Sequence, residues 1–112
     1  MTAAGHEWRP ICRHEDLQPE RGVAALVGGQ QVAVFRTFDG TLHAIDNQDP
    51  FTAAYVLSRG IVGSRRGAAT VASPLHKQVF DLRTGVCLDE DTVSGQVYAV
   101  RSRDGVVEVA VP

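Results

Sequence analysis

The sequence is short of the residues that several classes of small protein depend on. It has two cysteines, Cys12 and Cys87, and no Cys-x-x-Cys pair, which favours buried free thiols over a disulfide or a metal site built on both. Basic residues are not in excess either, because the chain has 11 basic and 13 acidic residues, for a net charge of −2. A nucleic-acid-binding protein normally shows a basic face, so we expect no nucleic-acid partner.

The sequence also lacks a long apolar run. Its apolar stretches are the length of a single β-strand, too short to span a membrane. Residues 1–7 lack the charged region and apolar core of a signal peptide, so we expect a cytoplasmic protein without a membrane partner. We expect residues 1–112 to form a single domain, with residues 1–6 flexible.

Short strands separated by turn residues make up most of the chain. Pro10 places the first strand at a sheet edge, because proline cannot donate to an inner ladder, and Asp39-Gly40 is a strong hairpin signal. No apolar pattern supports more than one helical turn, at residues 52–57. This pattern predicts an all-β fold, an antiparallel sandwich or partly open barrel. The predicted strands include residues 8–12, 23–27, 31–38, 41–46, 71–73, 78–82, 86–88, 97–101 and 106–111.

A histidine, His76, lies on a tight loop between two of these strands, and Pro74 ends the first of them. Residues 73–85 read Ser-Pro-Leu-His-Lys-Gln-Val-Phe-Asp-Leu-Arg-Thr-Gly. They resemble the second cluster-binding loop of Rieske iron–sulfur domains, Cys-Pro-x-His-x-x-x-Phe-Asp-Leu-x-Thr-Gly. Residues 46–51, Asp-Asn-Gln-Asp-Pro-Phe, resemble the first loop of that family, Asp-Asn-x-Cys-Pro-His.

Most of the family's ligand positions carry other residues here. Asp49 and Ser73 stand where the cysteines would be and Phe51 where one histidine would be, so that only His76 matches. A Rieske [2Fe–2S] centre needs two thiolates on one iron and two imidazoles on the other, and a carboxylate, a hydroxyl and a phenyl ring cannot replace them. The resemblance therefore implies a Rieske-like fold whose two loops form a small subdomain, without a cluster and without catalytic or cofactor-binding residues in this chain.

A plain structural role explains the altered positions best. Asp49 is expected to cap the turn before Pro50, and Phe51 to fill the space of the cluster. A mononuclear iron or zinc site remains an alternative, and it would need a second histidine and a carboxylate beside His76. The candidates are His6, His14, His43, Asp46 and Asp49.

The resemblance is strongest to the small subunits of assimilatory NADH-dependent nitrite reductases, and it covers nearly the whole chain. It implies a non-catalytic subunit that docks on and stabilises a large subunit carrying FAD, an iron–sulfur cluster and sirohaem. That large subunit would reduce nitrite to ammonium. We expect the loops to form the contact, because Phe51 and Leu75 would otherwise be an unexplained apolar patch. The expected interface residues are Asp49, Pro50, Phe51, Pro74, Leu75, His76 and Lys77.

Two alternatives come from other functional classes. An electron-carrying Rieske-type ferredoxin or oxygenase component would be coloured and contain about two irons per chain. A stand-alone binding module on the same fold would have no nitrite reductase partner, and fold alone does not separate this possibility from a subunit.

Overall fold

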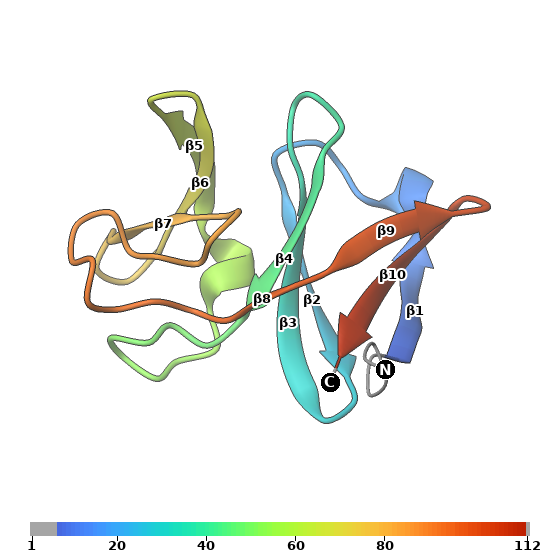
Figure 1. Ribbon diagram of the computed structural model, residues 1–112, viewed down its shortest axis with the longest axis horizontal. Helices are drawn as coiled ribbons and strands as arrows, with labels where there is room; N and C mark the ends of the chain where they lie inside the picture. Colours follow the sequence, from blue (N-terminus) through green and yellow to red (C-terminus); the bar gives the residue numbers. More distant parts are fainter. Residues whose placement is uncertain (1–6, 112) are drawn as a thin grey trace, which may run out of the picture.

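Antiparallel strands make up most of the described chain, which comprises residues 7–111 of a computed structural model (Figure 1). The flexibility expected for residues 1–6 lies outside the described residues. None of the helical segments within residues 7–111 has the length and apolar character needed to cross a membrane. The strands are β1 (Glu7–Arg13), β2 (Gly22–Val27), β3 (Gln30–Arg36), β4 (Leu42–Asp46), β5 (Ile61–Arg65), β6 (Ala68–Ala72), β7 (Val79–Asp81), β8 (Val97–Tyr98), β9 (Val100–Arg103) and β10 (Val106–Val111), and the 3-10 turns are η1 (His14–Asp16) and η2 (Leu57–Arg59).

The strands form three sheets, with orders β1-β10-β9, β2-β3-β4-β8 and β5-β6-β7. Figure 1 shows the four-stranded sheet in the middle, β1, β9 and β10 on its right and β5–β7 on its left. The predicted all-β fold is confirmed, and the sheets do not close into a barrel within the described residues. The predicted edge position of the first strand is also confirmed, because β1 pairs only with β10 and its register shifts between Pro10 and Cys12.

The middle sheet is buried on both faces, and this explains the apolar sequence of β3. Val32 and Val34 belong to a core shared with β10, whereas Ala33 and Phe35 belong to a second core shared with β6 and β7. Successive strand residues point to opposite faces, so a strand with two cores reads as a continuous apolar run. The second core fixes the loop-bearing part of the molecule, residues 47–95, against the middle sheet.

Four local predictions were wrong. The strand expected at residues 31–38 ends at Arg36. Residues 86–88 form only isolated bridges, between Phe80 and Cys87 and between Val86 and Ser94. The predicted strand 97–101 is divided at Ala99, so that β8 and β9 join different sheets. The helical turn expected at residues 52–57 forms instead at η2, where Asn47 accepts hydrogen bonds from the amides of Leu57 (3.0 Å) and Ser58 (2.7 Å). Local sequence patterns contain no information about such long-range partners.

The start of β2 passes so close to η2 that only glycine fits there. A methyl group at Gly22 would clash with the Ser58 carbonyl oxygen and lie 2.5 Å from Phe35 Cε1. We therefore expect Gly22→Ala to lower the free energy of unfolding by about 1–3 kcal/mol, the usual cost of overpacking a core. Gly63→Ala is the matched control, because its methyl group would have only an ordinary contact, 3.6 Å from Thr70 Oγ1. Urea denaturation of both variants measures the difference, and equal stabilities would contradict the close packing of β2 on η2.

Candidate functional site

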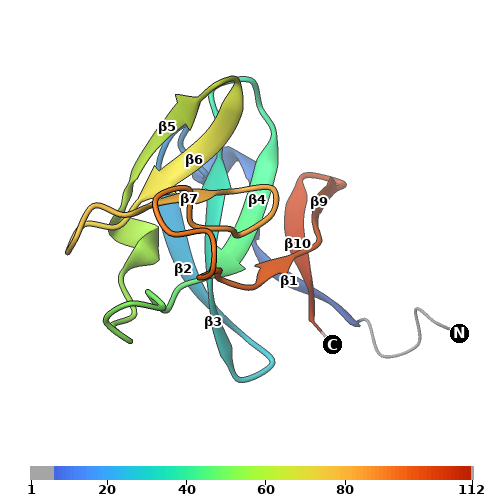
Figure 2. The same ribbon diagram turned by 60° about the vertical axis from the view of Figure 1, so that its left-hand side comes forward.

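Two loops, which carry the altered cluster positions, are joined in the structure, as the resemblance to Rieske domains implied. We call residues 47–56 the first loop and residues 73–78 the second loop. Both project on the left of Figure 2, where the first is green and the second yellow to orange. They hold the four positions that the resemblance singled out, Asp49, Phe51, Ser73 and His76.

A buried hydrogen bond joins the two loops at the cysteine positions. The Ser73 hydroxyl donates to Asp49 Oδ2 over 2.5 Å, and both residues are almost completely buried, with exposed fractions of 1% and 0%. The other Asp49 oxygen, Oδ1, accepts from the Phe51 amide at 2.8 Å. The expected turn-capping role of Asp49 is thus observed, but the bond to Ser73 was not foreseen. We call this interaction the Asp49–Ser73 clasp.

Each loop is also closed by its own backbone hydrogen bonds. In the first loop the Asp49 amide donates to the Ala54 carbonyl and the Ala53 amide to the Asp49 carbonyl, both over 2.7 Å. In the second, the Ser73 amide donates to the Gln78 carbonyl and the Lys77 amide to the Ser73 carbonyl, both over 2.9 Å. Ala53 (φ 65°) and Lys77 (φ 61°) adopt the left-handed conformation that non-glycine residues rarely take. The loops therefore have defined shapes, maintained by their own bonds and by the clasp.

The two histidine positions lie nearer the surface. The Phe51 ring lies 6.1 Å from the ring of buried Phe80, at an interplanar angle of 54°, and Phe51 is 38% exposed. Phe51 thus packs on the second core from outside rather than being enclosed. His76 is exposed, as are its second-loop neighbours Pro74, Leu75 and Lys77 and, in the first loop, Pro50. Of the seven expected interface residues, all except Asp49 are accessible to a partner.

Tyr55, which no sequence motif indicated, adds to the apolar surface of the loops. Tyr55 lies in the first loop and is 53% exposed, compared with 49% for Leu75 in the second. The sequence signal that could have identified Tyr55 as a surface residue is a large aromatic side chain that follows three small residues in a loop, Thr52, Ala53 and Ala54. We call Phe51, Tyr55 and Leu75 the loop patch.

The residues at the loops do not fit an iron–sulfur cluster. Neither loop contains a sulfur atom, and Asp49 and Ser73 use their side-chain oxygens to bind each other. Both thiols of the chain are free, and they lie elsewhere, with Cys12 in β1 and Cys87 in the second core. Within the described residues, no group of three or more His, Cys, Asp or Glu side chains is arranged to hold a metal ion. The donor set thus lacks the soft ligands that a cluster requires.

The alternative mononuclear site is not assembled from the described candidates. His14 Nδ1 lies 3.0 Å from Ser102 Oγ. Ser102 belongs to β9, whose sheet contains none of the strands that flank the two loops. His43 is buried in β4 next to the Leu82 carbonyl, and burial lowers the pKa of its imidazole. His6, the remaining candidate histidine, lies outside the described residues. The structure therefore brings neither His14 nor His43 into a metal-binding group with His76.

Asp46 is tied to the middle sheet. Its Oδ1 accepts a 3.2 Å hydrogen bond from the Tyr98 hydroxyl of β8. Burial, followed by the charge and the hydrogen bond of Asp46, raises the pKa of Tyr98 to about 12.

This raised pKa predicts a pH dependence of stability. Tyrosine in the unfolded chain ionises near pH 10, so the stabilisation by neutral Tyr98 is complete below pH 10. It is lost as the pH rises from about 10 to about 12. We expect the difference in unfolding free energy between the wild type and Tyr98→Phe to be constant below pH 10 and to shrink above it. Denaturation at a series of pH values measures this, and a difference that stays constant up to pH 12 would contradict it.

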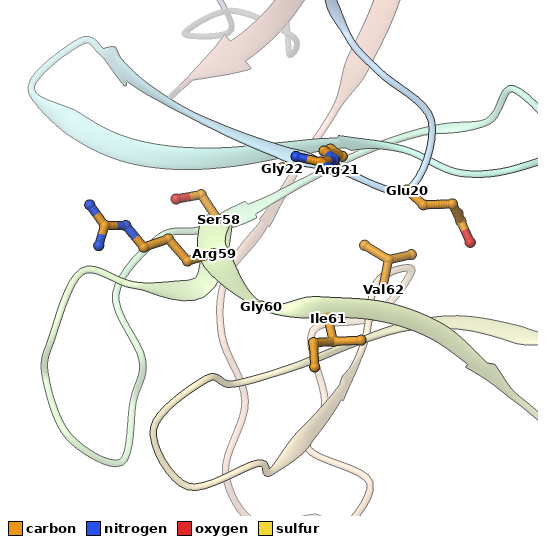
Figure 3. Close-up of a pocket in the computed structure, with 8 residues that line it drawn as sticks. All are labelled: Glu20, Arg21, Gly22, Ser58, Arg59, Gly60, Ile61 and Val62. Carbon is orange, nitrogen blue, oxygen red and sulfur yellow. The ribbon is translucent and has the colours of Figure 1, made fainter.

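A hollow of about 460 Å³ lies between the start of β2 and the start of β5 (Figure 3). In Figure 3 the Arg59 side chain extends to one side of it and the Glu20 side chain to the other. No predicted interface residue lines this hollow, so it is separate from the loops. Its lining residues are Glu20, Arg21, Gly22, Ser58, Arg59, Gly60, Ile61 and Val62.

Comparison with known proteins identifies relatives over nearly the whole chain. The family model of the Rieske-like [2Fe-2S] domain matches residues 7–110. The NADH nitrite reductase small subunit of Escherichia coli K12 is 44% identical over 104 residues, which cover 92% of this chain and 96% of that protein. A crystal structure of a putative NADH-dependent nitrite reductase small subunit from Mycobacterium tuberculosis superposes with a TM-score of 0.93 at 48% identity, covering 96% of each chain.

Two further relatives bear on how the domain is used. The NAD(P)H nitrite reductase large subunit of Klebsiella oxytoca is 36% identical over 102 residues, which are 91% of this chain but 11% of that protein. The ferredoxin of carbazole 1,9a-dioxygenase from Nocardioides aromaticivorans has a TM-score of 0.81 at 26% identity, covering 94% of this chain and 98% of the ferredoxin. The same fold therefore occurs in an electron carrier.

Proposed function

We propose that this chain is a non-catalytic subunit that docks on and stabilises the large subunit of an NADH-dependent nitrite reductase. The proposal starts from its family, because the chain belongs to the Rieske-like [2Fe-2S] domain family and, within it, to the small subunits of NADH-dependent nitrite reductase. The observation that carries the proposal is the donor set of the two loops. With a carboxylate and a hydroxyl bonded to each other at the cysteine positions, the domain has no means of holding a cluster. Its contribution then comes from its surface.

The redox chemistry is assigned to the large subunit. Reduction of nitrite to ammonium takes six electrons from NADH, and the resemblance implies that FAD, an iron–sulfur cluster and sirohaem on the large subunit carry them. The described residues of this chain contribute no group to that route in our proposal. The setting that fits such a complex is the cytoplasm, in nitrate and nitrite assimilation.

The relative from Klebsiella oxytoca supports a large-subunit partner. A sequence similar to 91% of this chain makes up 11% of that large subunit, so there a related domain is part of the same polypeptide. Covalent linkage keeps two domains at high effective concentration, whereas a separate chain must obtain its affinity from a contact surface. We therefore expect a specific interface on this chain.

The loop patch is the surface that we propose for this contact. Phe51, Tyr55 and Leu75 are exposed on loops whose shapes are fixed by backbone bonds and by the clasp. Exposed aromatic and aliphatic side chains on a rigid support lose little conformational entropy on binding, which favours them as interface anchors. The polar residues His76 and Lys77 lie beside them, as in the rim of a typical interface.

Co-purification with the large subunit tests this proposal. We expect the wild-type chain to be retained by a tagged large subunit, and the double variant Phe51→Asp/Leu75→Asp to be lost, because burying two carboxylates at an apolar contact is costly. Leu26→Asp is the matched control, since Leu26 is 76% exposed on β2 and is not among the expected interface residues. Retention of the double variant at the wild-type level would place the contact elsewhere.

The similarity to the carbazole dioxygenase ferredoxin makes an electron carrier the second candidate. This function requires a bound cluster, so it predicts about two irons per chain and visible colour in the purified protein. A stand-alone binding module would show neither iron nor association with the large subunit. Iron analysis and co-purification together therefore separate all three functions.

A further inference from the structure

Phe38 is the most exposed large hydrophobic side chain among the described residues, with 87% of its surface accessible. It lies at the tip of the hairpin between β3 and β4, between Thr37 and Asp39. This hairpin tip projects at the top of Figures 1 and 2, whereas the loop patch belongs to loops on the left of Figure 2. Phe38 is therefore not part of the surface proposed above.

The hairpin tip is held in one conformation by a dense set of hydrogen bonds. Asp39 Oδ1 accepts from the Thr37 hydroxyl (2.7 Å) and the Thr41 amide (3.1 Å), and the Gly40 amide donates to the Thr37 carbonyl (2.9 Å). The Phe38 amide donates to Glu20 Oε2 over 2.9 Å, which connects the tip to the loop between η1 and β2. An exposed aromatic ring on a tip fixed in this way is pre-organised for binding.

A hollow of about 290 Å³, with Phe38 among its lining residues, lies between this hairpin and the one formed by β5 and β6. Figures 1 and 2 both show the two hairpin tips next to each other at the top of the molecule. On the β5–β6 side the hollow is lined by small residues, Gly63, Ser64, Gly67 and Ala69, which leave room for a long side chain.

The charge of this hollow has one sign. Its lining includes two carboxylates, Glu20 and Asp39, and no basic residue. Hydrogen bonds from Thr37 and Thr41 lower the pKa of Asp39 to about 2, so its carboxylate is ionised at neutral pH. The neighbouring arginines have other contacts: Arg65 pairs with Asp89 at 3.2 Å, and Arg36 donates to the Leu17 carbonyl at 3.0 Å. Arg21 and Arg66 line separate hollows.

We propose that this two-hairpin face, comprising Phe38 and the adjoining hollow with Glu20 and Asp39, is a second contact with the large subunit and receives one of its arginine or lysine side chains. The inference rests on the proposed function. A cationic head group beside Glu20 and Asp39 gains charge-assisted hydrogen bonds, and its position near the Phe38 ring adds a cation–π contact. The aliphatic stem of such a side chain fits the small-residue wall of the hollow. The partner is thus recognised by charge here and by apolar contact at the loop patch.

The experiment measures the affinity of the immobilised large subunit for purified variants of this chain at low and high salt. We expect Phe38→Ser to weaken binding by about 30-fold, the usual effect of removing an aromatic anchor, and the double variant Glu20→Gln/Asp39→Asn to weaken it mainly at low salt. Leu26→Ser is the matched control and should bind like the wild type. Melting temperatures of all variants establish that they are folded.

The outcomes separate this inference from the proposed function. If Phe51→Asp/Leu75→Asp loses binding while folded Phe38→Ser and the Glu20/Asp39 variant bind like the wild type, the second contact is contradicted and the docking function stands. If Phe38→Ser instead disrupts only self-association of this chain, the occupant is a second copy and the inference is equally wrong. If the folded wild-type chain does not bind the large subunit at all, the proposed function fails and the inference with it.

Discussion

The triple variant Asp49→Cys/Phe51→His/Ser73→Cys is expected to bind a [2Fe–2S] cluster, with iron content rising from none to about two atoms per chain. Together with His76, the introduced groups complete two thiolates and two imidazoles at the spacing of the Rieske loops. The clasp already brings positions 49 and 73 together, and the fold is shared with a ferredoxin at a TM-score of 0.81. We therefore expect that the loops lack only the ligand side chains, two thiolates and one imidazole, that a cluster needs.

This gain of function is measured after anaerobic reconstitution with iron and sulfide under reducing conditions, which keep the two introduced thiols from forming a disulfide. Iron and sulfide content, visible absorption and electron paramagnetic resonance of the reduced protein report the cluster. The same triple variant with His76→Ala added is the control, because it lacks one ligand and should not give the Rieske signal. A folded triple variant that takes up no iron would show that loop shape, and not ligand chemistry, excludes the cluster.

Ser73→Ala is expected to lower the free energy of unfolding by about 2 kcal/mol, because it leaves a buried carboxylate oxygen without its partner. The bond that it removes is short, 2.5 Å, and its acceptor Asp49 is fully buried. Hydrogen exchange should accelerate in the first and second loops, while the middle sheet keeps its protection, since the clasp connects the loops and not the cores. Ser94→Ala is the matched control because Ser94 is exposed.

A double-mutant cycle with Asp49→Ala tests whether the clasp acts as a pair. The two single changes and the double change should show a coupling of about 1 kcal/mol or more, as contacting residues do. Additive effects, or a Ser73→Ala variant as stable as the wild type, would contradict the role of this bond in holding the loops together.

The sequence predicted much of the fold because strand signals are local. Pro10 indicated an edge strand and Asp39-Gly40 a hairpin, and both depend on backbone properties of the residues themselves. The errors occurred where distant partners decide, as at Asn47, whose side chain fixes η2 eleven residues away. The division of residues 97–101 between two sheets is likewise a property of the whole molecule.

For the site, the spacing of the Rieske loops located Asp49, Phe51, Ser73 and His76, but their chemistry gave no indication of a bond between the first and third. A pair 24 residues apart in the sequence becomes a contact only when both loops fold. Phe38 was assigned to a strand, and its exposure follows from the tight turn at Asp39, which ends β3 at Arg36. An exposed aromatic residue at a hairpin tip cannot be told from a buried strand residue by pattern alone.

In this protein a Rieske-like scaffold is retained for binding, we propose, while the cluster is absent. The most direct measurement is the iron and acid-labile sulfide content of this chain after it has been co-expressed with the large subunit, isolated as the complex and separated from it anaerobically. We predict a stable complex from which the small chain is recovered colourless and without iron. Recovery of this chain with about two irons and two sulfides per molecule would contradict the claim.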